Sequence, residues 1–355
     1  MEEQKEEVNV FPPREEKHLT KLEILRKLSP GTGLREGLND ILSGGMGALI
    51  VISNPNSSNI FEGGFNVDCD FSSKRLAELA KMDGAIILSE DFRKILYANT
   101  LLVPDRTISS SETGTRHQAG ERTAKQIDGL VIAVSERKGK ISVYYGNSRY
   151  VLQNTEELLR RATETLRILE KQREVFDDLL VNLNVLEVTN LVSVADVCTI
   201  LQRTQMIRKM ADIINEYIVE LGRDGIIVRM RMREVTKDIE EEETLIIKDY
   251  LSDPSRINEF FDDLSFEGLL DAENIAKLLF EESSEVRISP NGYRILSKTS
   301  LVQDEFDCLI QEFKNFDGII NSSEDKLRTI LNGRTEIFQK ELEKLKEQIM
   351  VGKKI

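Results

Sequence analysis

The chain has 355 residues, of which 40% are hydrophobic, and its formal net charge is −14. This length predicts two or three domains, and the apolar fraction excludes a wholly disordered chain. The negative charge excludes a protein that coats nucleic acid over its whole surface, although a local phosphate-binding patch depends on local charge.

The sequence predicts a protein of a reducing cytoplasm. It contains no run of about 18 apolar residues, so we expect no membrane span. Its first residues are charged and lack the apolar core of a signal peptide. Cys69, Cys198 and Cys308 are isolated and lack metal-ligand spacing, so we expect small core residues.

The first 152 residues have the pattern of an α/β domain. A loose arm is expected over residues 1–16, with His18 incidental, and a glycine-bearing loop over residues 61–71. Apolar periodicity predicts helices over residues 17–28, 34–42, 73–82 and 115–127. Short apolar runs predict strands over residues 47–52, 85–88, 95–98, 130–134, 141–145 and 149–152. We therefore expect a mixed sheet with helices on both sides.

Residues 153–285 predict an α-helical spine. A long amphipathic pattern without glycine or proline covers residues 156–186. Further helical patterns cover residues 194–221, 226–235, 243–251, 257–264 and 266–280. The acidic run Glu240–Glu243 is expected to be a solvated helix face or loop.

Residues 286–355 predict short helices joined by tight turns. Helices are expected over residues 303–313, 316–320 and 336–350, with a capping signature at Ser322 and Ser323. The turn over residues 331–335 contains Asn332, Gly333 and Arg334. This arrangement resembles a helix-hairpin-helix module, whose hairpin points backbone amides at a DNA phosphate.

Two motifs in the first domain point to nucleotide chemistry. Asp83-Gly84-Ala85 places a carboxylate on a tight turn ahead of an apolar run. Residues 114–123 place a guanidinium, an imidazole, a hydroxyl and backbone amides where a loop enters a helix, which is an arrangement that receives phosphate. Alone, Asp83 is also typical of a simple turn, and His117 of a residue that holds a loop in shape.

The paired motifs resemble the diadenylate cyclase domain family, which joins two ATP molecules into cyclic di-AMP, and the flanking segments resemble its DNA-integrity-scanning branch. The resemblance covers nearly the whole chain. It implies a cyclase domain over residues 1–152, a linker over 153–285 and a DNA-binding domain over 286–355. It further implies that Asp83 holds Mg²⁺ or Mn²⁺ and activates the ribose 3′-hydroxyl.

The resemblance also assigns contacts to ATP. Arg116 and His117 would be catalytic and would grip the triphosphate, as the charge and planar fork of arginine suit phosphate oxygens. The ATP-binding positions implied are Gly84, Leu102, Thr115, Arg116, His117, Gln118, Ala119 and Ser135. The family implies Asn332, Gly333 and Arg334 as the DNA-binding positions.

The chain departs from the family pattern at several positions. Gln118 replaces the usual second arginine, and loss of one charge-assisted contact costs on the order of 1.5–3 kcal/mol. Ala119 stands where scanning members often have threonine, and Glu136 begins a segment that is usually more basic. The hairpin retains only Gly333 of two usual glycines, with Asn332 able to adopt positive φ.

Because one site holds one ATP, the product requires two facing domains, and the family implies a homo-octamer whose modules bind branched, junction-like DNA. Two other functions stay open. One is a DNA-binding, nucleotide-binding scaffold with little turnover, weakened by Gln118. The other is a DNA-binding architectural oligomer that the cyclase domain mainly assembles.

Overall fold

The computed structural model describes residues 19–57, 59–251, 261, 264, 266–269, 272–280 and 283–355. The predicted arm over 1–16, His18 and most of the helix predicted over 257–264 lie outside these residues. The chain forms two compact units: one comprises Met1–Glu157 with Val219–Asp224, and the other comprises Leu158–Ile218 with Gly225–Ile355. Each unit is described by itself.

The first unit is built on a mixed sheet with strand order β2-β5-β4-β1-β6-β7-β8, and β3 also pairs with β5. Strands β1 and β4 run parallel, whereas the other paired strands are antiparallel. The strands are β1 (Ala48–Ile52), β2 (Phe61–Glu62), β3 (Phe65–Asp70), β4 (Ala85–Leu88), β5 (Lys94–Leu102), β6 (Leu130–Ser135), β7 (Lys140–Tyr145) and β8 (Ser148–Leu152).

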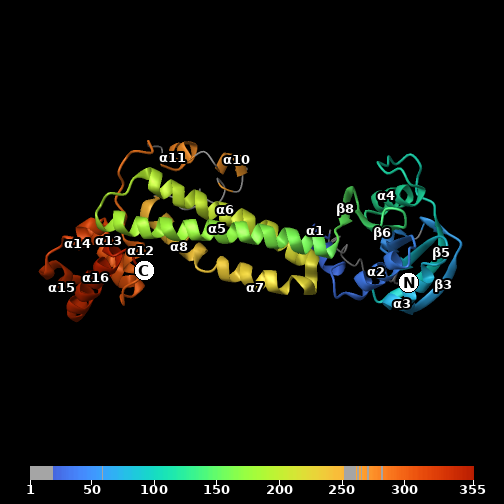
Figure 1. Ribbon diagram of the computed structural model, residues 1–355, viewed down its shortest axis with the longest axis horizontal. Helices are drawn as coiled ribbons and strands as arrows, with labels where there is room; N and C mark the ends of the chain where they lie inside the picture. The colour runs from blue at the N-terminus through green and yellow to red at the C-terminus, as the bar shows by residue number, and fades with distance from the viewer. Residues whose placement is uncertain are drawn as a thin grey trace, which may run out of the picture. The chain divides into compact units, whose positions relative to one another are not determined.

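Helices cover both faces of this sheet, as predicted (Figure 1). The helices of the unit are α1 (Lys21–Lys27), α2 (Gly33–Ser43), α3 (Ser73–Leu79) and α4 (Thr115–Ile127), with short 3₁₀ turns η1 (Pro55–Ser57) and η2 (Gly222–Gly225, whose last residue is in the second unit). A capping box at Thr20 begins α1, and the hydroxyls of the N-cap residues of α2 and α3, Thr32 and Ser72, accept from the backbone N–H groups of Arg35 and Arg75.

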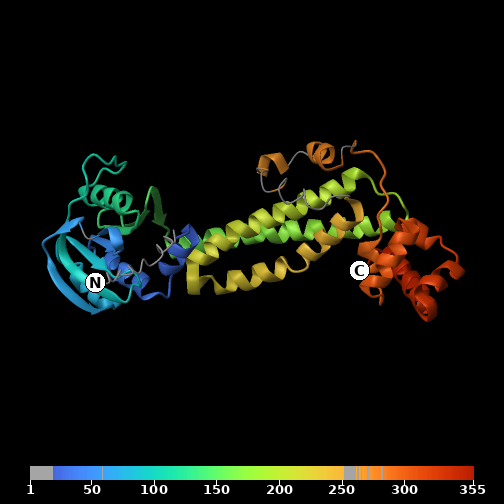
Figure 2. The same cartoon turned by 180° about the vertical axis from the view of Figure 1, so that it is seen from behind.

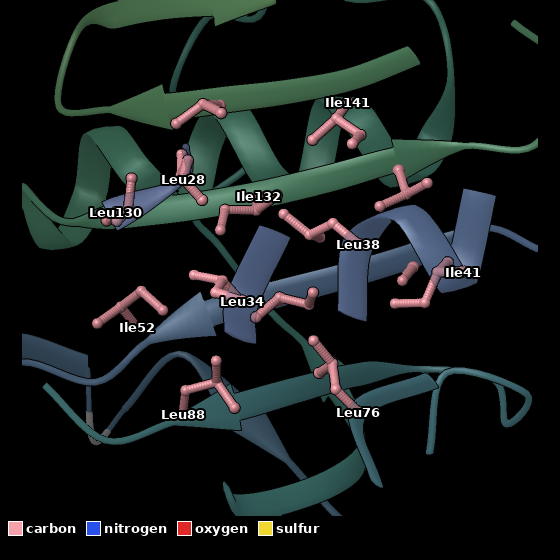
Figure 3. Packing of buried hydrophobic residues seen from close by; sticks show 14 of the residues in the cluster. Leu28, Leu34, Leu38, Ile41, Ile52, Leu76, Leu88, Leu130, Ile132 and Ile141 are labelled. Carbon is pink, nitrogen blue, oxygen red and sulfur yellow. The ribbon is translucent and has the colours of Figure 1, made fainter. Parts of the chain in front are cut away.

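Strand alternation divides the apolar side chains between the two faces. In β1, Ile50 and Ile52 join the core under α1, α2 and α3, whereas Leu49 and Val51 join the core under α4. Figure 3 shows the first core, in which α2 lays its leucines and Ile41 over the strands. Because both faces are covered, the central strands are continuous apolar runs without a polar alternation.

Two predictions in this unit were wrong. The loop predicted over residues 61–71 contains β2 and β3, whose residues are mostly exposed and therefore give no apolar run. The strand predicted over residues 95–98 extends to Leu102, which pairs with Phe61 of β2. Cross-strand pairing outweighed weak local patterning at this edge of the sheet.

The second unit is helical, as predicted. Arg203 of α6 donates to Gln172 of α5, and Arg231 of α7 pairs with Glu170 of α5, so α6 and α7 lie along α5 (Figure 2). Its helices are α5 (Thr155–Val188), α6 (Val194–Leu221, with its last residues in the first unit), α7 (Ile226–Val235), α8 (Ile239–Tyr250), α10 (Phe266–Leu269) and α11 (Ala272–Phe280). No helix in the described residues is long and apolar enough to span a membrane.

The C-terminal residues of this unit pack around their own apolar cluster, which includes Phe316 and Phe338. The helices are α12 (Tyr293–Leu296), α13 (Gln303–Phe313), α14 (Phe316–Ile320), α15 (Glu324–Leu331), the 3₁₀ turn η3 (Asn332–Arg334) and α16 (Thr335–Met350). Ser323 stands at the N-cap of α15, where the capping signature predicts a helix start, but its side chain makes no capping hydrogen bond. The helix-hairpin-helix identity and the boundaries at 152 and 285 stay predictions.

Two expectations about individual side chains need correction. Glu243 is not solvated: its carboxylate is buried and accepts from Thr204, Gln205 and Arg208. The cysteines are not all core residues, since only Cys198 is buried and Cys308 is exposed. Local sequence cannot reveal that α6 brings partners to one glutamate of an acidic run.

Candidate functional site

The start of α4 is the centre of the candidate site. Gly114 is its N-cap with extended backbone and no side-chain cap, so the first amides of the helix have no side-chain acceptor. The predicted helix over residues 115–127 is confirmed to the residue. A helix start with free amides and a positive dipole end attracts phosphate.

Arg116 lies over the backbone of Gly47, one residue before β1. A Cβ placed on Gly47 would lie 1.8 Å from Arg116 Nη1, so only glycine leaves room for this position of the guanidinium. Arg116 is partly exposed, so its charge remains available to a ligand.

These groups open into a cavity of about 940 Å³ between the start of α4, the ends of β4 and β5, and the β6–β7 turn. This volume lies at the upper end of the range for small-molecule sites. The charged residues that line the cavity are Arg116, Arg137, Lys138, Lys140, Arg149, Glu112 and Glu136. Basic groups outnumber acidic ones, so the cavity suits a polyanion.

The structure brings most of the predicted ATP-binding residues to this cavity. Those that line it are Gly84, Leu102, Thr115, Arg116, His117, Ala119 and Ser135. These residues come from four separate segments of the chain, and the sheet and α4 bring them together.

Asp83 and Gln118 do not line the cavity. Asp83 is exposed and precedes Gly84, which does line it. Gln118 instead donates from Nε2 to the backbone carbonyl of Glu112 at 2.8 Å. The residue at the position of the family's usual arginine therefore holds the loop between β5 and α4.

Gly84 is required for a structural reason. Its φ is +91°, and a Cβ would lie 2.8 Å from the carbonyl oxygen of Thr100 on β5. Any side chain would therefore separate β4 from β5 at the edge of the cavity. This steric role does not depend on a ligand, and the predicted approach of a nucleotide to Gly84 stays a prediction.

Ser135 and Leu102 are already engaged within the protein. Ser135 Oγ accepts from the backbone N–H of Lys138 at 3.3 Å, which holds the β6–β7 turn. Leu102 is the last residue of β5, in the ladder opposite Phe61. Both residues therefore line the cavity from the ends of strands, Ser135 from β6 and Leu102 from β5.

Sequence reasoning missed a hydrogen-bonded chain beside the cavity. His117 Nδ1 lies 2.9 Å from the hydroxyl of Tyr144, which donates to Glu112 Oε1 at 2.8 Å. Arg149 Nε lies 2.7 Å from the same carboxylate oxygen. Glu112 stands just before the motif, so its position could have indicated a role at the site. Tyr144 lies within an apolar strand pattern, where the sequence does not distinguish it from a core residue.

The electrostatic environment shifts two of these groups. Burial lowers the pKa of His117, and the cations of Lys138, Arg149 and Arg116 lower it further against the opposing effect of Glu112. Burial also raises the pKa of the Tyr144 phenol, and its hydrogen bond to Glu112 adds to the shift. Both groups are therefore neutral at physiological pH.

The residues present offer few ligands for a metal ion. Among the described residues, no three His, Cys, Asp or Glu side chains gather in a way that holds a metal. A lone carboxylate such as Asp83 suits Mg²⁺ only when substrate phosphates and water complete the shell, which is the usual mode at nucleotide sites.

A sheet-based domain with a basic cavity at a helix start defines a nucleotide-binding α/β protein. The chain matches the family described as DisA bacterial checkpoint controller nucleotide-binding over residues 35–149, and its linker region over residues 152–286. It is 40% identical to the DNA integrity scanning protein DisA of Clostridium botulinum, covering 96% of this chain and 100% of that protein. It is 39% identical to that of Clostridioides difficile, covering 94% and 97%.

The chain therefore belongs to the DisA family and is a diadenylate cyclase, a nucleotidyltransferase. Among solved structures, it is similar to a DacA double mutant from Staphylococcus aureus, with 24% identity, 40% of this chain and 95% of that chain covered, and a TM-score of 0.29.

Proposed function

We propose that the cavity binds one ATP with its triphosphate over the start of α4. The observation that carries this proposal is the convergence of Thr115, Arg116 and His117 at a helix start inside a basic cavity. The adenine would lie toward Leu102 at the end of β5, with Ala119 and Ser135 beside the nucleotide.

In this proposal Asp83 holds Mg²⁺ or Mn²⁺ together with the substrate phosphates. A metal held there would supply positive charge that offsets the negative charge of the phosphates. Asp83 itself would orient and deprotonate the ribose 3′-hydroxyl, while Arg116 would hold the α- to γ-phosphates for in-line attack by a second ATP. Gly84 would allow the sugar to approach the backbone.

Two chains must face each other for this reaction. The product, cyclic di-AMP, contains two adenylates joined in both directions, whereas the cavity holds one nucleotide. The ATP bound to each chain would present its 3′-hydroxyl to the α-phosphate of the ATP bound to the other chain, across a two-fold axis. Each attack would release one pyrophosphate. We extend this to a homo-octamer, as the family resemblance implies.

The role of Asp83 is tested by Asp83→Asn, with the exposed acid Glu90→Gln as a matched control. Cyclic di-AMP formation from ATP with Mg²⁺ or Mn²⁺ should fall about a hundredfold or more in the Asp83 variant, because the general base is lost. Binding of 3′-deoxy-ATP, measured without a divalent metal so that the metal ligand is not tested at the same time, should change by less than about threefold. Full turnover by Asp83→Asn would refute the assignment.

A catalytically weakened scaffold is the alternative, and the position of Gln118 argues against it. Since Gln118 lies outside the cavity lining and bonds to the loop, replacing it does not add charge where phosphates would bind. Gln118→Arg should change cyclic di-AMP formation by less than about threefold, because an arginine can donate to the same carbonyl. A large gain would favour the alternative.

We also propose that the C-terminal helices bind branched DNA, and that binding lowers cyclase activity. The printed name of the relatives, DNA integrity scanning protein, supports a DNA role. Asn332 has φ +49°, as a hairpin turn needs, but Arg334 pairs with Glu305 and donates to Ser300, so its charge is partly used within the protein. A protein acting on DNA and ATP would work in the bacterial cytoplasm, at the nucleoid.

Gly333 allows a clean test of the DNA contact. A Cβ here meets no atom within 4 Å, so substitutions do not disturb the fold. Gly333→Glu should weaken binding of a four-way DNA junction about tenfold by placing a negative charge against phosphate, whereas Gly333→Ala should change it by less than about threefold. Equal affinity of both variants for the junction, measured by fluorescence anisotropy, would exclude this turn as a DNA contact.

A further inference from the structure

The hydrogen-bonded chain Glu112–Tyr144–His117 has a defined direction. Glu112 is ion-paired with Arg149 at 2.7 Å, so its carboxylate accepts hydrogen bonds only. Tyr144 has a single hydroxyl proton, and that proton is donated to Glu112 Oε1. The tyrosine oxygen must therefore accept from His117 Nδ1, which carries a proton.

This arrangement leaves the other ring nitrogen for the cavity. His117 lines the cavity, and within the part of the chain described here its Nε2 has no hydrogen-bond partner. In neutral imidazole with a proton on Nδ1, Nε2 is a bare acceptor. A bare acceptor repels a phosphate oxygen, so His117 can donate to a triphosphate only after Nε2 gains a proton.

Charged groups on several elements packed around His117 influence whether Nε2 is protonated. The cations are Arg116 on α4, Lys138 in the β6–β7 turn and Arg149 on β8, and the anion is Glu112 on the β5–α4 loop. Burial and the cations favour neutral imidazole in the free enzyme. A triphosphate brings negative charge that outweighs the cations and favours imidazolium.

The loop that carries Glu112 is itself fastened to α4. Glu121 accepts from Ser110 at 2.6 Å and from the backbone N–H of Ser111 at 2.9 Å. Gln118 donates to the Glu112 carbonyl at 2.8 Å. The carboxylate is thus held in place before any ligand arrives, which is what a positioning role requires.

We infer that Glu112 and Tyr144 are positioning residues that fix His117 as the Nδ1–H tautomer, so that nucleotide binding adds one proton from solvent at Nε2. The uptake step rests on the proposed contact of His117 with the triphosphate. The fixed tautomer does not, because it is a property of the free protein.

The tautomer is measured by magic-angle-spinning NMR of the full chain labelled with ¹³C,¹⁵N-histidine. The chain contains only two histidines, so His18→Gln assigns the spectrum. The free protein should show the Nδ1–H form of His117. Tyr144→Phe, which keeps the buried ring but removes the acceptor, should shift His117 to the Nε2–H form.

Tyr145→Phe is the matched control, because this neighbouring hydroxyl accepts from the backbone N–H of Leu19 and does not contact His117. It should leave the His117 signals unchanged. An Nε2–H form in the free protein, or a tautomer unaffected by Tyr144→Phe in a variant that keeps its helical circular dichroism, would overturn the positioning role.

Proton uptake is measured by titration calorimetry with Mg²⁺ and 3′-deoxy-ATP, which lacks the attacking hydroxyl, in buffers of different ionisation enthalpy near neutral pH. Wild type should take up a measurable fraction of a proton per nucleotide. Tyr144→Phe should reduce this by about half or more and His117→Gln should abolish it. Equal uptake in wild type and His117→Gln would overturn the uptake step, and unaltered affinity in His117→Gln would refute the proposed phosphate contact while leaving the tautomer result standing.

Discussion

At the scale of single residues, the site depends on glycines that permit close approach. Gly84 has φ +91° and lies against the Thr100 carbonyl, and Gly47 lies under the Arg116 guanidinium. Glycine stands at both positions because the fold leaves no room for a Cβ there. The motif letters Asp-Gly-Ala revealed the first glycine, whereas nothing in the local sequence distinguished Gly47 from its neighbours Gly44 and Gly45.

Gly47→Ala should displace Arg116 without removing it. The added methyl would overlap Nη1, which is the far end of a flexible side chain, so the fold should survive. Loss of a charge-assisted contact of about 1.5–3 kcal/mol predicts ATP binding weaker by roughly tenfold to a hundredfold. Isothermal titration calorimetry with 3′-deoxy-ATP measures this loss of affinity.

Gly33→Ala is the control for that substitution, since its Cβ would make ordinary contact with Phe71 at 3.4 Å. This variant should bind the nucleotide like wild type. Unchanged affinity in Gly47→Ala would show that Arg116 does not grip the ligand from its present position.

At the scale of elements, helices hold the segments that carry function. The β5–α4 loop (residues 103–114) is tied to α4, where Arg122 donates to Ile108, Lys125 donates to Ser109, and Gln126 accepts from the N–H of Asp105. These tertiary contacts order a loop whose sequence has no regular periodicity. The loop in turn supplies Glu112 to the cavity.

Glu121→Gln should loosen this loop. Despite opposing burial, hydrogen bonds from Ser110, Lys125 and Ser111 lower the pKa of Glu121 to about 2 from 4.5. The carboxylate therefore stabilises the folded loop above pH 4.5, and this contribution is lost as pH falls toward about 2. Amide exchange over residues 105–113 should be faster in the variant at neutral pH.

The free energy of local opening of this loop, obtained from the exchange rates, should fall by about 1–3 kcal/mol in Glu121→Gln, which is the cost of weakening hydrogen bonds to a charged group. Glu78→Gln, which breaks only an exposed pair with Lys81, should not change exchange in this loop. Equal exchange in Glu121→Gln and wild type would contradict the prediction.

In the second unit, Asp249 of α8 fastens α12. Its carboxylate is buried and accepts from the backbone N–H groups of Gly292, Tyr293 and Arg294 at 2.7, 2.6 and 2.9 Å. Burial, with the nearby Glu187 carboxylate, nevertheless raises the pKa of Asp249 to about 7 from 3.8. The folded state therefore binds its proton more tightly than the unfolded state.

This raised pKa predicts a specific pH dependence. The stabilising contribution of protonated Asp249 is complete below pH 3.8 and is lost as pH rises to about 7. The stability of wild type relative to Asp249→Asn should therefore fall across that window and stay constant above it. Calorimetric unfolding at several pH values measures the difference, with the exposed acid Asp212→Asn on α6 as control; a flat difference would contradict the raised pKa.

At the scale of the whole molecule, each unit has its own core, and the first unit carries the cavity of about 940 Å³ at the start of α4. A diadenylate cyclase forms two linkages between two nucleotides. If this cavity binds one ATP, as proposed, the two nucleotides must come from two copies of the chain.

Cyclase activity per chain should therefore fall on dilution, whereas nucleotide binding should not. As facing chains dissociate, the rate should approach a second-order dependence on protein concentration, while the affinity for 3′-deoxy-ATP stays within about threefold. Mass photometry across the same dilution series reports the assembly. Constant activity per chain in a population shown to be monomeric would contradict reaction across facing chains.

The sequence by itself determined much of this protein. Periodicity placed α4, α6, α7 and α13 at their observed bounds, because long apolar patterns reflect burial of one helix face. The continuous apolar runs placed the central strands, and the paired motifs identified the cyclase family.

Only the tertiary structure decided the rest. The exposed strands β2 and β3 exist through pairing with β5, and Gln118 turns to the loop because Glu112 offers a carbonyl there. The partner of His117 is Tyr144 on β7, which is 27 residues away in sequence, and Tyr144 in turn bonds to Glu112 on the β5–α4 loop. Local patterns record which side of an element is buried, whereas hydrogen bonds between distant segments depend on where the whole fold places them.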